Sequence, residues 1–246
     1  MSSVAGQTTY LVELKNRIQL AERTMAFEFE KPQCFTFKGG QSIDVTLINP
    51  PETDGEGNRR AFSLASAPHE RLLSVATRMR DTAFKRVLGA LPTGSQVKID
   101  GPFGNLVLHH DEARAAVFLA GGIGITPMRS MLLQATREHL RHRVFLFYSN
   151  SRPENAPFLE ELDRLQRQNP NYTFVPTMTA IRGSDRSWQR ETGQIDQVML
   201  AKHLEGVASA IYYMAGPSGM VRAMHTLLNS MGVDDDDIRT EEFVGY

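Results

Sequence analysis

Three glycines, Gly121, Gly122 and Gly124, lie close together just before Thr126 and Pro127. An apolar run precedes them and a helix-like run follows them. Glycine permits a tight turn and close backbone approach, and the start of a helix offers unpaired N–H groups to an anion. The segment therefore predicts a cradle for the diphosphate of a dinucleotide. Its spacing is not GxGxxG, so a turn that serves packing alone is the open alternative.

The segments that precede this turn predict strands. Short β-leaning runs alternate with turn residues, and several such strands at this spacing favour an antiparallel barrel. One helical stretch, residues 83–91, interrupts them, and residues 49–59 form an exposed loop rich in Pro, Gly, Asp and Glu. The β-leaning runs cover residues 9–14, 25–29, 42–47, 61–64, 72–77 and 96–99.

After Asp111 the pattern changes to strands that alternate with helices, which predicts a parallel, doubly wound sheet. The expected strands are 117–120, 144–149, 172–178 and 211–215, with a further strand at 238–243. The expected helices are 127–140, 156–168, 195–203 and 218–231. We therefore predict two domains, an antiparallel β-barrel over residues 1–110 and an α/β domain over residues 111–246.

Composition excludes several classes of function. The 246 residues carry a formal net charge of -1, which gives no electrostatic footprint for nucleic acid or an anionic membrane. Cys34 is the only cysteine, so intramolecular disulfides, iron–sulfur clusters and cysteine-rich zinc sites are excluded. The sequence shows no bilayer-length apolar run and no secretory leader. We expect a soluble, cytoplasmic protein without membrane insertion.

Four motifs in one order make a resemblance specific. Residues 60–66 read RAFSLAS and residues 101–104 read GPFG; the glycine turn follows, and residues 214–220 read MAGPSGM. The chain closes with EEFVGY. In this order the motifs resemble those of the ferredoxin–NADP reductase family, with its Arg-x-Tyr-Ser flavin motif and its late Cys-Gly-Pro-Pro-x-Met motif. The resemblance covers nearly the whole chain and implies FAD in the barrel and NADH or NADPH in the α/β domain.

For the barrel, the resemblance implies that Arg60 offers a planar pair of donors to the FAD phosphates. It implies that Phe62 lies against the flavin ring, without the hydroxyl of the family's tyrosine, and that Ser63 acts in catalysis by a hydrogen bond near flavin N5. Thr82 matches a residue that meets the FAD diphosphate at a helix start, although Thr82 or Asp81 equally serves as the helix N-cap. Backbone contacts to the flavin are implied for Ala61, Ala76 and Thr77.

For the α/β domain, the resemblance implies that the glycine turn contacts the diphosphate and nicotinamide. The residues assigned to this role are Gly121, Gly122, Ile123, Gly124, Thr126 and Pro127, with Gly216, Pro217 and Met220 from the late motif. Ala215 replaces the family's cysteine, which hydride transfer does not strictly need. Met128 and Met131 are expected in a helix core. Arginines 152, 182, 186 and 190 either touch a phosphate or are solvated. The preference for NADH or NADPH is therefore open.

The C-terminal aromatics have two interpretations. By the resemblance, Phe243 or Tyr246 covers the flavin face that nicotinamide must occupy, which gives that ring a catalytic gating role. Alternatively, this segment is an edge strand with a frayed end. Glu242 is a candidate proton relay whose geometry the sequence leaves open.

Other polar features predict no site. Adjacent His109 and His110 are expected to face solvent or cap a turn, and no metal-like ligand spacing accompanies them. The acidic run 234–237 reads as a solvated loop. Cys34 is expected to be a small buried side chain.

These features predict an NAD(P)H-dependent flavoprotein reductase. It would pass a hydride from nicotinamide to flavin and then electrons to a separate acceptor, such as a ferredoxin or an oxygenase component. Two alternatives are open: a free-flavin or quinone reductase, and a non-catalytic FAD-binding protein that serves regulation or electron transfer within a complex. The sequence does not set the acceptor or the oligomeric state.

Overall fold

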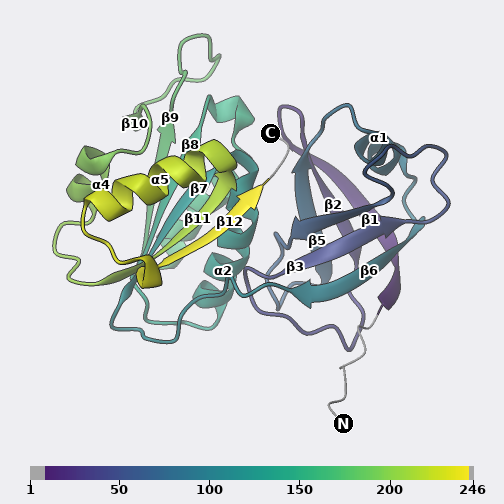
Figure 1. The fold of residues 1–246 in the computed structure, drawn as a ribbon, viewed down its shortest axis with the longest axis horizontal. Helices are drawn as coiled ribbons and strands as arrows, with labels where there is room; N and C mark the ends of the chain where they lie inside the picture. Colours follow the sequence, from purple (N-terminus) through teal and green to yellow (C-terminus); the bar gives the residue numbers. More distant parts are fainter. Residues whose placement is uncertain (1–8, 244–246) are drawn as a thin grey trace.

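The computed structural model describes residues 9–243, which form two domains side by side (Figure 1). The first domain is a six-stranded antiparallel sheet in the order β4-β3-β6-β1-β2-β5. An antiparallel bridge between Leu64 and Val75 joins the two edges of this sheet into a barrel. Its elements are β1 (Thr9–Ala21), β2 (Thr24–Glu30), β3 (Ser42–Leu47), β4 (Arg59–Ser63), β5 (Leu72–Arg78), α1 (Ala83–Ala90) and β6 (Gln96–Phe103).

Alternating polarity explains the barrel. In β3 the side chains of Ile43, Val45 and Leu47 are buried, whereas the polar residues between them are partly exposed. Successive side chains of a strand point to opposite faces, so this pattern directs every second residue into the barrel core. The aromatic rings of Phe27 and Phe29 fill the same core from β2.

The second domain is a six-stranded parallel sheet in the order β10-β9-β8-β7-β11-β12. Separate apolar clusters lie on its two faces, so the sheet is doubly wound as predicted. The strands are β7 (Ala115–Gly121), β8 (Val144–Asn150), β9 (Tyr172–Met178), β10 (Glu191–Thr192), β11 (Ala210–Pro217) and β12 (Ile238–Phe243). The α-helices are α2 (Ile125–Arg137), α3 (Leu159–Gln168), α4 (Gln197–His203) and α5 (Ser218–Ser230), and the short 3₁₀ turns are η1 (Gly122–Gly124), η2 (Pro153–Asn155) and η3 (Asp235–Asp237).

Burial distinguishes the two kinds of strand. Every residue of β7 is buried, because helices cover both faces of a parallel sheet. Met128 and Met131 of α2 are buried in the core, as predicted. No helix within residues 9–243 has the length and apolar character needed to cross a bilayer.

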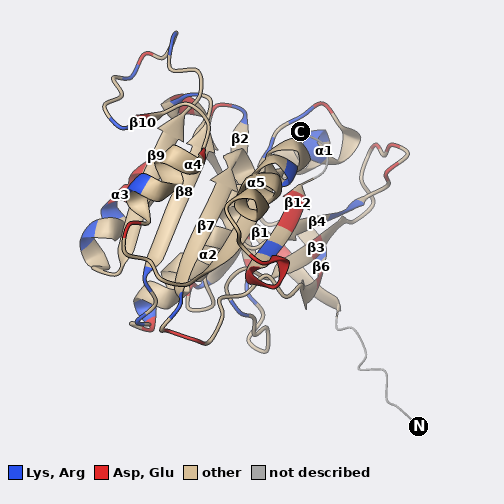
Figure 2. Cartoon of the chain, turned by 60° about the vertical axis from the view of Figure 1, so that its left-hand side comes forward, with Lys and Arg blue, Asp and Glu red and all other residues tan. Residues whose placement is uncertain are grey.

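Two local predictions are wrong. His109 is buried, and its Nδ1 lies 2.8 Å from the hydroxyl of Tyr213. It is buried because the residues that lead into the second domain pass beneath the sheet of that domain. Cys34 is exposed. The acidic run is exposed over residues 234–236, as predicted, and forms the turn that leads into β12 (Figure 2). Asp237, at the end of this run, pairs with Arg114 at 2.6 Å.

One buried guanidinium joins the domains. Arg129 of α2 is 8% exposed, donates to the carbonyl of Ala65 in the barrel at 2.5 Å and pairs with Glu70 at 3.2 Å. Within its own domain it pairs with Glu161 at 2.7 Å and lies 4.8 Å from the ring of Phe158. The interface is therefore held by a charge that is hydrogen-bonded on both sides.

We expect Arg129→Met to reduce the free energy of unfolding by about 3 kcal/mol, because removing one partner leaves the others of a buried ion-pair network unpaired. Urea denaturation of the purified protein measures the change. Arg137→Met, at an exposed position of the same helix, is the matched control and should change little. Equal stabilities of the two variants would contradict this role for Arg129.

Candidate functional site

A cavity of about 520 Å³ lies between the two domains. Its walls come from β4, β5 and α1 of the barrel and from η1, α2 and β12 of the α/β domain. The predicted flavin-side residues that line it are Arg60, Ala61, Phe62, Ser63, Ala76, Thr77, Thr82 and Phe243. Ile123 and Thr126, which were predicted to contact the nicotinamide coenzyme, line it as well. The fold thus brings together residues that are more than half the chain apart.

A hydrogen bond across the cavity joins the domains. Ser63 ends β4, and its Oγ donates to Oε1 of Glu241 in β12 at 3.0 Å. The second carboxylate oxygen of Glu241 is buried without a hydrogen-bond partner. Burial raises the pKa of the Glu241 carboxyl, and the hydrogen bond from Ser63 opposes this rise only in part. The cavity wall therefore contains a carboxyl group that holds its proton more readily than usual.

Sequence reasoning chose Glu242 for this position and missed Glu241. Both line the cavity, but Glu241 is the one bonded to Ser63. Since alternate residues of a strand share a face, the choice of Phe243 as a flavin-facing residue already implied Glu241. The other aromatic candidate, Tyr246, lies outside the described residues.

The middle of the cavity is apolar. Ile123 packs with Ala26 and Ala76 in a small cluster that Phe243 also contacts. Phe62 lies on the barrel side, with its ring 6.0 Å from that of Phe84. This surface suits a flat, largely apolar ring system.

One end of the cavity is cationic. Arg60, Arg80 and Lys85 line it together with Thr82, the N-cap of α1, whose Oγ1 accepts from the Lys85 N–H at 3.4 Å. Burial lowers the pKa of Lys85, and the nearby charges of Arg80 and Arg60 lower it further. Positive charge concentrated at a helix start is suited to phosphate. With the apolar middle and the Ser63–Glu241 pair, this donor set fits FAD.

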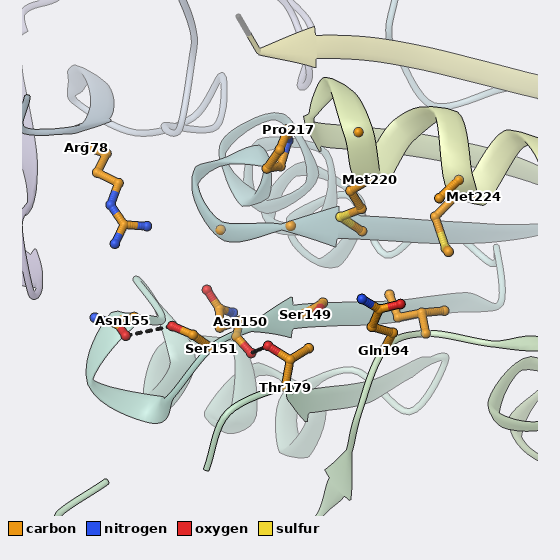
Figure 3. A pocket seen from close by; sticks show the side chains of 15 residues that line it. Arg78, Ser149, Asn150, Ser151, Asn155, Thr179, Gln194, Pro217, Met220 and Met224 are labelled. Carbon is orange, nitrogen blue, oxygen red and sulfur yellow. Dashed lines mark hydrogen bonds between the residues drawn. The ribbon is translucent and has the colours of Figure 1, made fainter. Parts of the chain in front are cut away.

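A second cavity, of about 400 Å³, lies at the carboxyl ends of the parallel strands (Figure 3). Four residues that were predicted to contact the coenzyme line it: Gly121, Gly122, Pro217 and Met220. Polar side chains from the ends of β8 and β9 face them: Ser149, Asn150, Ser151 and Thr179. Open α/β sheets bind nucleotides at this edge, so the location fits a nicotinamide dinucleotide.

Two of the predicted glycines are closely packed within the fold. A Cβ added to Gly124 would lie 2.0 Å from the carbonyl oxygen of Ala215. Gly216 has a φ of +155° and lies against the backbone of Gly121. The glycine turn therefore packs directly against the late motif, and this contact requires glycine at position 124.

The two residues after the turn are buried at the start of α2. Thr126 donates its hydroxyl to the Ile123 carbonyl at 3.2 Å, so it does not cap the helix by its side chain, although it lines the first cavity. Pro127 lies in the first helical turn, where a missing N–H costs no hydrogen bond.

Arg78, at the end of β5, is a residue that sequence reasoning missed. It lines both cavities, and Figure 3 shows its guanidinium reaching from the barrel toward the ends of β7 and β8. The sequence offered one signal for Arg78: it is a cationic residue at the end of the strand that carries Ala76 and Thr77.

Several arginines considered for the coenzyme phosphates are engaged elsewhere. Arg152 pairs with Glu22 of the barrel at 2.9 Å and donates to the carbonyl of Gly183 at 3.1 Å. Two of the other arginines also pair with carboxylates: Arg186 with Glu160, and Arg190 with Asp163.

Known proteins with similar sequences agree with this geometry. Residues 118–226 match the oxidoreductase NAD-binding domain family. One component of the Na(+)-translocating NADH-quinone reductase of Haemophilus influenzae is 30% identical over 201 residues, which is 76% of this chain and 48% of that relative. The corresponding component from Neisseria gonorrhoeae is also 30% identical, with 49% of it covered. The chain thus spans about half the length of the curated relatives it matches.

Solved structures show the same fold across both domains. A cytochrome P450 reductase from Amycolatopsis superposes with a TM-score of 0.80 at 19% identity, covering 98% of this chain and 73% of that one. A ferredoxin NADP+ reductase from Neisseria gonorrhoeae, solved with FAD and NADP, gives 0.76 at 22% identity, covering 95% and 98%. The order of the domains, the two cavities and the matched NAD-binding domain lead to one conclusion: residues 118–226 form an oxidoreductase NAD-binding domain, and the whole chain has the two-domain fold of ferredoxin–NADP reductases.

Proposed function

We propose that this protein passes a hydride from NADH or NADPH to an FAD held between its domains, and then passes electrons to a separate acceptor. The observation that carries the proposal is the junction of the two cavities. Ile123 of η1 lines the first cavity, its neighbour Gly122 lines the second, and Arg78 lines both. A dinucleotide at the sheet edge would therefore meet a flavin at η1 without further rearrangement of the domains.

The chain's own residues would bind, orient and exchange protons. When bound, FAD supplies the group that accepts the hydride and releases electrons singly or in pairs. Ser63 would present its hydroxyl to the flavin edge. Because Glu241 holds its proton more readily than usual, this carboxyl can return a proton to the cavity through Ser63.

Positioning is the other contribution. Hydride transfer requires the two rings to be stacked with their reacting atoms in line. Phe243 would lie over the ring site, where nicotinamide must displace it. The cradle on the nicotinamide side would consist of Gly121, Gly122, Pro217 and Met220, with Arg78 opposite them.

For the acceptor we propose a separate electron-transfer protein, with a quinone or free flavin as the second candidate. The second candidate is supported by the matched relatives, which are named as parts of an NADH-quinone reductase. We place the reaction in the cytoplasm, where reduced nicotinamide dinucleotides are generated.

The decisive experiment starts from purified protein reconstituted with FAD. Anaerobic mixing with NADH and, separately, NADPH should bleach the flavin absorbance band, and the ratio of the two rates sets the coenzyme preference. Protein that takes up FAD but is bleached by neither coenzyme would support a non-catalytic role instead.

Arg78→Ala should raise KM for the nicotinamide coenzyme about tenfold with little change in kcat, because a hydrogen bond to a charged group contributes roughly 1.5–3 kcal/mol. Steady-state kinetics with a small-molecule acceptor measure both constants. Arg71→Ala removes an exposed arginine at the opposite end of β5 and should leave KM unchanged. An unchanged KM in Arg78→Ala would remove Arg78 from the coenzyme site.

Glu241→Gln should lower the rate of flavin reduction about 100- to 10,000-fold, the usual contribution of a positioned acid or base. It should also alter stability. The folded-state pKa of Glu241 is raised, so its favourable contribution is present at low pH and is lost as pH rises through that pKa, above the ordinary value of 4.5. The variant should therefore gain stability relative to wild type as the pH rises from the ordinary value of 4.5 through the raised pKa.

Thermal unfolding across this pH range, without flavin, tests the second effect. Glu242→Gln changes the same charge at the next, exposed position and serves as the control. A stability difference for Glu241→Gln that does not vary with pH would contradict the assignment of a raised pKa.

A further inference from the structure

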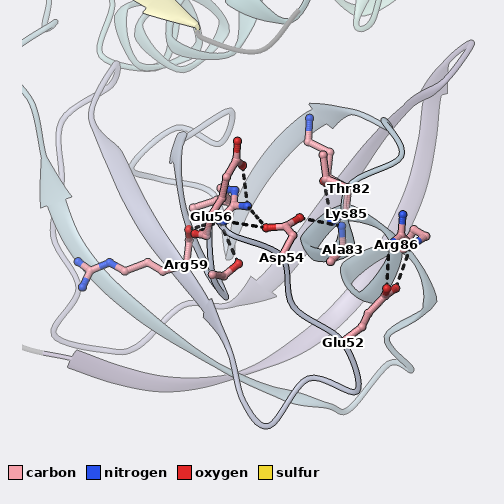
Figure 4. Close-up of polar contacts among 10 residues, drawn as sticks. Glu52, Asp54, Glu56, Arg59, Thr82, Ala83, Lys85 and Arg86 are labelled. Atoms are coloured by element: carbon pink, nitrogen blue, oxygen red, sulfur yellow. Dashed lines mark hydrogen bonds and ion pairs between the residues drawn. The ribbon is translucent and has the colours of Figure 1, made fainter.

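The loop between β3 and β4 places three carboxylates along the cationic end of the flavin cavity (Figure 4). Asp54 accepts from the Ala83 N–H at 3.0 Å, which is the first N–H of α1, and pairs with Arg60 at 3.3 Å. Glu56 pairs with Arg60 at 2.7 Å. Glu52 lies further along and binds Arg86 through two hydrogen bonds of 2.9 and 2.7 Å.

Asp54 and Glu56 interact with the same hydrogen-bond donors that a diphosphate would need. The two terminal nitrogens of Arg60 are both engaged: Nη1 donates to the carbonyls of Glu56, Gly57 and Arg59, and Nη2 faces the two carboxylates. At the start of α1, Asp54 accepts from Ala83 at the position where an anion gains most from the helix dipole. A phosphate cannot take both Nη2 and the Ala83 N–H while these carboxylates stay in place.

Exposure shows that the carboxylates can be displaced. The Glu56 side chain is 73% exposed and lines the cavity, and that of Asp54 is 33% exposed. Exposed ion pairs contribute little free energy, so turning Glu56 into water costs little. A doubly charged diphosphate would compete well for the same donors, but it must first release these contacts.

We propose that Asp54 and Glu56 are specificity-determining residues that act as internal counter-anions for Arg60 and α1. They reduce the contribution of the phosphates to flavin binding, so they lower the preference of the protein for FAD over riboflavin. This inference rests on the proposed function of the cavity.

Titration of flavin-free protein with FAD and with riboflavin, followed by flavin fluorescence, tests the inference. Glu56→Gln should lower the Kd for FAD about threefold, and Asp54→Asn with Glu56→Gln about tenfold, in line with the strength of exposed ion pairs. The Kd for riboflavin should not change in either variant, because riboflavin carries no phosphate. Glu52→Gln makes the same charge change in the same loop, on Arg86, and should alter neither Kd.

Hydrogen exchange gives a readout that is independent of affinity and activity. FAD should accelerate amide exchange in residues 52–58, since the loop loses its contacts, whereas riboflavin should not. A Kd for FAD that is equal in wild type and Glu56→Gln, or protection of residues 52–58 by FAD, would overturn the counter-anion role. If neither flavin binds wild type or any variant, the proposed function itself is wrong.

Discussion

The buried guanidinium of Arg129 is the interaction on which the arrangement of this protein depends. It belongs to α2, yet it donates to a carbonyl of the barrel and pairs with carboxylates of both domains. Its neighbour Ser130 adds a second tie, from its hydroxyl to the carbonyl of Ser66 at 2.6 Å. A buried charge tolerates few alternative partners, since leaving it unpaired is costly. The two domains therefore meet in one orientation, and helix α2 starts at the glycine turn that both cavities share.

That orientation creates the site. The barrel contributes Ser63 and Arg78, and the α/β domain contributes Glu241 and the glycine turn, so neither domain contains the complete arrangement. The turn is also held from within its own domain, because Gly124 lies against the end of β11 with no room for a Cβ. Rigid support on both sides suits a reaction that depends on the alignment of two rings.

Charge is balanced differently at the two ends of the flavin cavity. At one end a carboxyl of Glu241 is buried with a single hydrogen bond, which favours its protonated form. At the other end, Arg60 and Lys85 lie beside a helix start, and an exposed acidic loop covers Arg60. The first arrangement suits proton exchange, and the second is the one that we propose weakens the binding of phosphates.

Local sequence patterns were enough to predict the barrel, the parallel sheet and the order of their elements. The resemblance to the reductase family supplied most of the residues that line the cavity. Strand and helix periodicity, glycine turns and short motifs depend on neighbours a few residues away, which such patterns record. Helix starts were less well predicted, as for α2, which begins at Ile125 rather than at Pro127.

Long-range packing established the rest. It determines that Glu241 rather than Glu242 binds Ser63, that Arg78 lines both cavities and that Gly124 serves packing. The burial of His109 and the exposure of Cys34 have the same origin. These outcomes depend on contacts between distant parts of the chain, such as the 178 residues that separate Ser63 from Glu241, and no local pattern encodes such a distance.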